Sequence, residues 1–188
     1  MICTIIDDFF DSKFLFELSD LVESLSFCPN NIANRKTWPY GSLGSHKLFG
    51  CKIFERSGLN RIDFLHEKSS TFFDIFEAIE DSLNQKFYLS RIDINLQHSF
   101  CDGTTHLDKN YGSHTIMLMS NSHWEKEWGG KFQIISENDE SVVEEHDYIP
   151  GRIILFPSSF LHRGLSPNKK YIYRHTIVFR VKLISFEE

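Results

Sequence analysis

Residues 103–108 read Gly-Thr-Thr-His-Leu-Asp, and this short stretch carries the strongest signal in the chain. Side chains two positions apart point to the same face of extended backbone, so His106 and Asp108 are expected to lie side by side. An imidazole next to a carboxylate supplies two ligands of a metal site. The chain contains nine histidines, however, and one such pair can arise by chance. A third ligand is therefore needed before the pair predicts a site.

His162, which follows Asp108 by 54 residues, is the candidate for that third ligand. Two histidines and one carboxylate that leave open positions on the metal are typical of non-haem Fe(II) oxygenases. Arg174 and Thr176 follow His162 and are two positions apart, so they share one face of an expected strand. Arg180 has the same parity and is an alternative to Arg174, but the spacing from His162 favours Arg174.

The size and composition of the chain indicate one globular domain, residues 1–188, with an aromatic-rich core. A net charge of −6 argues against a nucleic-acid partner. The four cysteines are widely spaced and form no zinc or thioredoxin motif, so free thiols in a reducing setting are expected. Neither a signal peptide nor a membrane-spanning run is apparent, which predicts a cytoplasmic location. We make no prediction of the oligomeric state.

The first 87 residues are expected to provide helical support and a substrate loop. Apolar residues at helical spacing predict a helix that starts at Asp11 or Ser12 and ends before Cys28, and a second that opens with a capping box at Thr71. Residues 29–50 are interpreted as a long loop, with short strands at 48–54 and 62–65. The basic stretch 35–61 is either a solvated surface or a substrate-selecting lid.

From residue 88 onward, short β-rich segments alternate with Gly, Asn, Asp and Pro. Strands are expected at 88–97, 114–120, 131–136, 142–145, 152–156 and 171–184. Together with the two helices, this pattern predicts a mainly β fold with supporting α-helices, in which residues 88–188 form the core.

Four segments of the second half carry a family resemblance. They are Arg91 to Asn95 followed by 103–108, the stretch 114–132 with its Trp124, Trp128 and paired glycines, the strand 150–156, and His162 with Arg174-x-Thr176. In this order they resemble the Fe(II)- and 2-oxoglutarate-dependent dioxygenases of the prolyl-4-hydroxylase-like branch. The resemblance implies a double-stranded β-helix, also called a jelly roll, in which residues 114–132 form a central hairpin.

The resemblance also implies roles for the site residues. His106, Asp108 and His162 would hold Fe(II), Arg174 and Thr176 would bind the distal carboxylate of 2-oxoglutarate, and Asn95 is a further candidate contact to this co-substrate. The expected reaction uses O₂ to hydroxylate a C–H bond, with ascorbate as a candidate reductant. A prolyl or other side chain of a protein or peptide is the first expected substrate, and a free amino acid or small molecule is the alternative. A catalytically silent jelly-roll binding module is the alternative from another class.

Several other residues near these motifs are interpreted as structural. Trp124 and Trp128 are expected to pack in the core rather than to form a substrate cage. His175 should face away from Arg174, because neighbouring side chains of a strand point to opposite faces. Cys101 lies close to the metal-binding turn, where it is either a structural residue or a thiol sensitive to oxidation.

Overall fold

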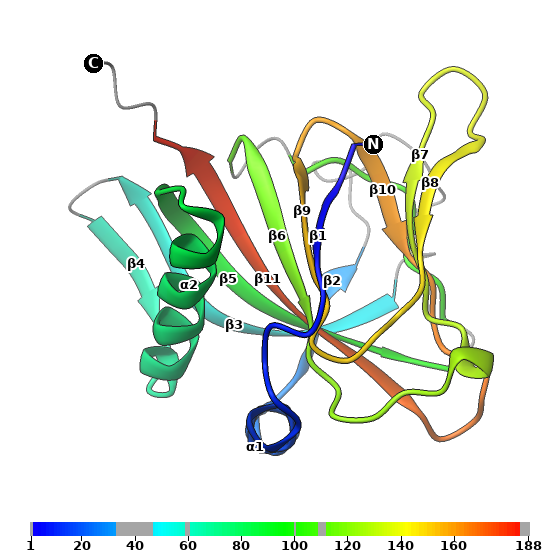
Figure 1. Ribbon diagram of the computed structural model, residues 1–188, viewed down its shortest axis with the longest axis horizontal. Helices are drawn as coiled ribbons and strands as arrows, with labels where there is room; N and C mark the ends of the chain where they lie inside the picture. Colours follow the sequence, from blue (N-terminus) through cyan, green and yellow to red (C-terminus); the bar gives the residue numbers. More distant parts are fainter. Residues whose placement is uncertain (1, 33–46, 59–60, 100, 109–111, 185–188) are drawn as a thin grey trace.

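The computed structural model describes residues 2–32, 47–58, 61–99, 101–108 and 112–184, in which two antiparallel sheets face each other (Figure 1). The larger sheet has the order β1 (Thr4–Ile6), β9 (Ile153–Pro157), β6 (His114–Met119), β11 (Tyr173–Leu183), β5 (Phe87–His98), β3 (Lys47–Gly58) and β2 (Cys28–Ile32), with β4 (Arg61–Leu65) paired to β3. The smaller sheet has the order β10 (Leu161–Gly164), β7 (Phe132–Ile135) and β8 (Val142–His146). This arrangement confirms the predicted jelly roll with two supporting helices.

The first helix, α1 (Ser12–Glu23), begins where the sequence predicts. The carboxylate of Asp11 accepts a hydrogen bond of 2.7 Å from the backbone N–H of Phe14, which satisfies one of the unpaired donors of the first turn. Leu15, Leu18 and Val22 recur at helical spacing and are buried. The helix therefore forms one apolar face that packs against the sheet.

The second helix, α2 (Ser69–Leu83), begins two residues before the expected start at Thr71, so the predicted capping box is wrong. His66 starts the helix instead. Its carbonyl accepts a hydrogen bond from the N–H of Ser69, and its ring Nδ1 accepts one from the N–H of Lys68. These contacts satisfy backbone N–H groups at the start of α2 that have no partner within the helix. The helix therefore begins before the position that a cap at Thr71 would set.

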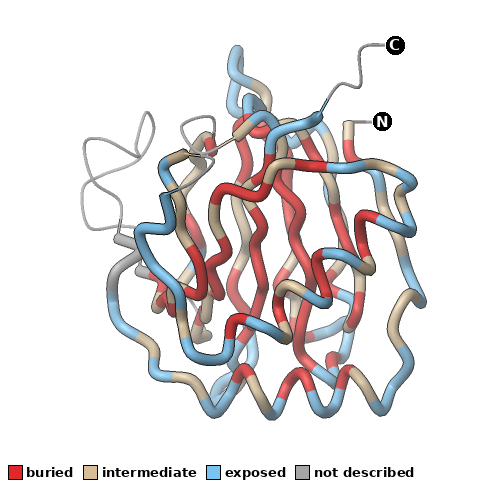
Figure 2. Tube along the Cα trace, turned by 90° about the vertical axis from the view of Figure 1, so that its left-hand side faces the viewer, coloured by how far each residue is buried: buried red, intermediate tan, exposed pale blue. Residues whose placement is uncertain are grey.

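Two apolar layers hold the fold together. One lies between the helices and the larger sheet and contains Phe72 and Ile79 of α2 together with Ile177 and Phe179 of β11. The other lies between the two sheets and contains Val178 of β11. Figure 2 shows the buried residues along the strands that lie behind the helices, with exposed residues on the outer segments. Because side chains alternate along β11, the even-numbered positions from 174 to 180 face the smaller sheet.

Three expectations for the strands need correction. Residues 114–132 do not form a hairpin, because β6 pairs with β9 and β11 in the larger sheet whereas β7 pairs with β8 and β10 in the smaller one. The chain crosses between the sheets at Gly129 and Gly130, which have φ values of 73° and 78°. β10 was not predicted. Residues 29–50 are not a loop throughout, since β2 and β3 occupy both ends of this range.

The first half of the chain contributes strands β1 to β4 to the larger sheet, in addition to both helices. Within the stretch 35–61 interpreted as a lid, residues 35–46 and 59–60 lie outside the described residues. Of its basic side chains that are described, Lys52 pairs with Glu55 and Arg61 lies 2.8 Å from Asp63. Within the described ranges, neither helix has the length and apolar character needed to cross a membrane.

Candidate metal centre

His106, Asp108 and His162 come together at one end of the smaller sheet. His106 and His162 lie opposite each other as an isolated antiparallel bridge, in which each backbone N–H donates to the other residue's carbonyl at 3.0 Å. The N–H of Asp108 donates to the carbonyl of Ser158 at 3.1 Å, which fixes the backbone on the far side of the turn. As a result, one donor atom from each of the three side chains lies within 4.8 Å of the others.

Both imidazole rings are held in the orientation that a metal site needs. Nδ1 of His106 lies 2.8 Å from the carbonyl oxygen of Thr104, and Nδ1 of His162 lies 3.0 Å from that of Phe160. A carbonyl oxygen only accepts, so each Nδ1 carries a proton and Nε2 is the ring atom that can bind a metal. These Nε2 atoms lie 3.8 Å and 3.3 Å from the carboxylate oxygens of Asp108. Such backbone contacts are the usual second layer of a metal-binding histidine.

Asp108 is buried and ionised. Burial by itself would raise the pKa of this carboxyl, but the charge of Arg180 and then the two histidines hold it well below its usual range. Oδ2 forms an ion pair with Nη1 of Arg180 at 2.6 Å and accepts a hydrogen bond from the hydroxyl of Thr115 at 3.1 Å. Oδ1 faces His106. Oδ1 and two imidazole Nε2 atoms therefore form a donor set that fits a divalent transition metal.

Arg174 is almost completely buried, with 2% of its surface exposed. Its Nε donates to the carbonyl of Gly130 at 2.9 Å and its Nη1 donates to the side-chain oxygen of Gln97 at 2.8 Å. Nη2 is buried and has no hydrogen-bond partner among the described residues. Burial lowers the pKa of Arg174 to about 10, partly offset by Tyr148. Since both acceptors are neutral, this buried cation is suited to an incoming carboxylate.

The other two predicted co-substrate residues lie in the same row of side chains. Thr176 is opposite Asn95 in the pairing of β11 with β5, just as Arg174 is opposite Gln97. Thr176 is buried and Asn95 is half-buried. All four positions have the parity that faces the smaller sheet. The structure therefore brings Arg174, Thr176 and Asn95 onto one wall between the sheets.

At Gly164, this wall comes close to the candidate metal ligands. Gly164 lies two residues after His162 on β10, and its carbonyl accepts hydrogen bonds from the N–H of Gly103 and the amide of Gln97. A Cβ at Gly164 would lie 3.1 Å from Nη1 of Arg174. The glycine thus lets the guanidinium approach the strand that carries His162.

Sequence reasoning missed the residues that position the site. Gln97 orients Arg174, whereas Thr115 and Ser158 hold Asp108 in place. Gln97 could have been predicted from the sequence, because it lies two residues after Asn95 on the same strand face. Ser158 is 50 residues from Asp108 and belongs to no motif, and Thr115, seven residues after Asp108, lies in the stretch 114–132 but carries no pattern that links it to the carboxylate. Arg180, the alternative to Arg174, forms an ion pair with Asp108, one of the candidate metal ligands.

The residues interpreted as structural are buried or half-buried and pack within the fold. Trp124 and Trp128 are each 9% exposed and pack edge to face, with ring centroids 5.5 Å apart. His175 is on the opposite face from Arg174, and burial lowers its pKa to about 4. All four cysteines are free thiols, as expected, and Cys101 is half-buried with its carbonyl bound to the amide of Gln97.

Comparison with known proteins rests on structure alone, because no protein-family model and no curated protein matches the chain. An oxidoreductase of the 2OG-Fe(II) oxygenase family from Burkholderia pseudomallei is 14% identical with a TM-score of 0.67, covering 95% of this chain and 84% of that one. A prolyl hydroxylase from Trichoplax adhaerens, in complex with a hypoxia-inducible-factor peptide fragment, is 18% identical with a TM-score of 0.66, covering 96% and 83%.

A viral collagen prolyl hydroxylase from Paramecium bursaria Chlorella virus-1, in its 2OG complex, is 12% identical with a TM-score of 0.59, covering 96% of both chains. Each of these likenesses covers at least 95% of this chain. The protein therefore has the fold of the 2OG-Fe(II) oxygenases and prolyl hydroxylases, which confirms the resemblance seen in its sequence motifs.

Proposed function

We propose that this protein is an Fe(II)- and 2-oxoglutarate-dependent dioxygenase that hydroxylates a C–H bond. One observation carries the proposal. Three side chains offer metal-binding atoms that lie within 4.8 Å of one another. Two residues after His162, Gly164 lies against a buried arginine, Arg174, whose Nη2 has no hydrogen-bond partner among the described residues. A catalytically silent binding module would have no need for this complete set. The fold shared with known oxygenases supports the same conclusion.

Each residue has a defined task in this proposal. Nε2 of His106, Nε2 of His162 and Oδ1 of Asp108 hold Fe(II). Arg174 binds the distal carboxylate of 2-oxoglutarate through its free Nη2, and the hydroxyl of Thr176 donates to the same group. Asn95 lies opposite Thr176 and contacts the co-substrate from β5.

Bound Fe(II) supplies the oxidative chemistry, in which O₂, 2-oxoglutarate and a C–H bond yield succinate, CO₂ and an alcohol. The protein binds and orients the reactants and excludes water. Phe132 and Phe156 contribute to this exclusion, because their ring centroids lie 5.8 Å and 4.7 Å from that of His162. A dry site also strengthens the pairing of Arg174 with a carboxylate.

A protein or peptide side chain, prolyl first, is the substrate class that we propose. The support is the structural likeness to a prolyl hydroxylase that is in complex with a peptide fragment. A free amino acid or another small molecule is the alternative. Succinate release measured against proline-containing peptides and against free amino acids separates the two. The same assay with and without ascorbate tests the reductant.

The test of the site itself uses the visible absorption that arises when 2-oxoglutarate chelates Fe(II). The protein is mixed with Fe(II) and 2-oxoglutarate without oxygen, and a metal-to-ligand charge-transfer band is expected. Asp108→Ala, which removes one ligand, should abolish the band. A wild-type protein that binds Fe(II) but shows no band on addition of 2-oxoglutarate would refute the proposed function.

A further inference from the structure

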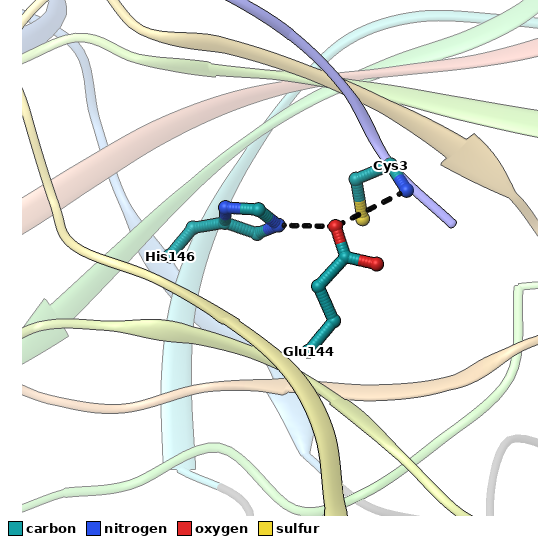
Figure 3. Close-up of side chains that lie close together, drawn as sticks. All are labelled: Cys3, Glu144 and His146. Carbon is teal, nitrogen blue, oxygen red and sulfur yellow. Dashed lines mark hydrogen bonds and ion pairs between the residues drawn. The ribbon is translucent and has the colours of Figure 1, made fainter. Parts of the chain in front are cut away.

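A second group of metal-binding side chains lies at the opposite edge of the smaller sheet. Cys3, Glu144 and His146 each offer one donor atom, and the three atoms lie within 4.8 Å of one another. Figure 3 shows the carboxylate of Glu144 between the ring of His146 and the side chain of Cys3. The His106 centre is next to β10, whereas Glu144 and His146 belong to β8, at the other end of the order β10-β7-β8. The two groups are therefore separate.

This cluster joins the free edges of the two sheets. Cys3 immediately precedes β1, the edge strand of the larger sheet, and β8 is the edge strand of the smaller one. Oε2 of Glu144 accepts a hydrogen bond of 2.7 Å from the N–H of Ile2, and Oε1 has a longer contact of 3.4 Å with the N–H of Cys3. A bond between β1 and β8 at this place would hold the two sheets together.

The donor atoms match the preferences of zinc. Zn²⁺ is bound by thiolate, imidazole and carboxylate in four-coordinate sites. Nε2 of His146 lies 3.0 Å from Oε1 of Glu144, and these side chains are each 15% exposed. Cys3 is 3% exposed. Oε2 of Glu144 accepts the hydrogen bond from the Ile2 N–H. Oε1 of Glu144 can bind a cation, because its contact with the Cys3 N–H is long.

We propose that Cys3, Glu144 and His146 form a second metal site, which binds Zn²⁺ and fastens β1 to β8. Sγ of Cys3, Nε2 of His146 and Oε1 of Glu144 are three ligands, and water takes the fourth position. Burial, followed by the charge of Glu144, raises the pKa of the Cys3 thiol to about 12 in the metal-free protein. The metal replaces the thiol proton, which leaves to solvent, and neutralises the thiolate and carboxylate together.

Cobalt is the probe, because its bond to a thiolate gives a sulfur-to-metal charge-transfer band in the near ultraviolet. The set His106, Asp108 and His162 contains no sulfur, so the band cannot arise there, and cysteine variants decide which thiol gives it. Co²⁺ is titrated into the reduced protein. We expect the band in wild type and in Asp108→Ala, which makes this test independent of the proposed oxygenase function.

Matched variants identify the ligands. Cys3→Ser should abolish the band, whereas Cys51→Ser, at another buried cysteine, should retain it. His146→Ala keeps the thiol and should weaken Co²⁺ binding at least about 10-fold, since even changes outside the ligand shell cost that much. The variant His146→Ala also tests the site if Cys3→Ser fails to fold. A wild-type protein without the band overturns the proposal, and so does an unchanged affinity in His146→Ala.

Zinc binding should also stabilise the fold. In Asp108→Ala, Zn²⁺ at about 100 times its Kd should raise the Tm by roughly 5–10 °C. The double variant Asp108→Ala with His146→Ala should show little of this shift. An equal shift in both proteins would mean that Zn²⁺ binds elsewhere and would contradict the assignment.

Discussion

Replacing Arg174 with methionine should abolish tight binding of 2-oxoglutarate and leave the metal ligands in place. Methionine is unbranched and uncharged, so it fills the space of the side chain without offering a donor. The guanidinium is buried, with two nitrogens bound to neutral oxygens, and Nη2 has no hydrogen-bond partner in the described part of the chain. A carboxylate that enters this site and finds no partner is left as an unpaired buried charge, which costs about 3–5 kcal/mol. The Kd should therefore rise roughly 150- to 4,000-fold.

The effect on folding should be much smaller than the effect on binding. Burial already disfavours the charge of Arg174, as the lowering of its pKa to about 10 indicates. Methionine removes this cost but leaves the carbonyl of Gly130 and the amide oxygen of Gln97 without their donor. The two effects oppose each other, so we expect the free energy of unfolding to change by at most about 2 kcal/mol. Urea unfolding of the metal-free protein measures this change.

The binding assay is an anaerobic titration of 2-oxoglutarate into the Fe(II)-loaded protein, followed by the charge-transfer band. Arg163→Met is the matched control, because Arg163 lies next to His162 on β10 and bonds to Gln133 instead of facing Arg174. It should bind 2-oxoglutarate with the wild-type Kd. A Kd for Arg174→Met within threefold of wild type would show that another group binds the carboxylate. A loss in Arg180→Met alone would assign that role to Arg180.

Three further outcomes are expected. Arg180→Met leaves the carboxylate of Asp108 buried without its cation, so the metal-free protein should lose about 3 kcal/mol in urea unfolding, and Mn²⁺ should raise the Tm more than in wild type. Gly130→Ala places a Cβ 2.7 Å from a ring atom of Trp124, at a backbone φ of +78°. It should lower the free energy of unfolding by about 2–4 kcal/mol in the same assay. Gly58→Ala is the control and should be tolerated, because a Cβ there meets no atom of the described residues within 4 Å. The hydrogen bond from Arg152 lowers the pKa of Asp7, so Asp7→Asn should be less stable than wild type at pH 7, and the difference in Tm should shrink as the pH falls below the usual aspartate pKa of about 4.

Local patterns in the sequence predicted most elements of this fold. The helical spacing of Leu15, Leu18 and Val22 placed α1, and short β-rich segments placed most strands of the second half within two residues. Patterns of this kind depend on side-chain periodicity, which a single segment displays. β10 was missed because four residues, one of them glycine, are too few to show a period. The start of α2 was missed because His66 supplies hydrogen bonds that no capping motif describes.

At the candidate metal centre, the sequence by itself pointed to the candidate ligands and their order. The spacing of His106 and Asp108 indicated a pair, and His162 followed as the third candidate. Only the tertiary structure decided how they meet, because the backbone bridge between His106 and His162 depends on the pairing of β10 with β7. Arg174 and Arg180 share one strand face, so parity could not say which of them contacts Asp108.

Throughout the chain, local backbone geometry determines what the sequence predicts, and contacts between distant segments determine what only the tertiary structure shows. Which face a side chain points to follows from local backbone geometry, and the sequence determines it. Which distant side chain lies opposite depends on strand register and on how the sheets close, and those are set by the packing of the whole core. Cys3 and Glu144, which are 141 positions apart in the chain, belong to no shared motif. Only the closure of β1 against β8 brings them together.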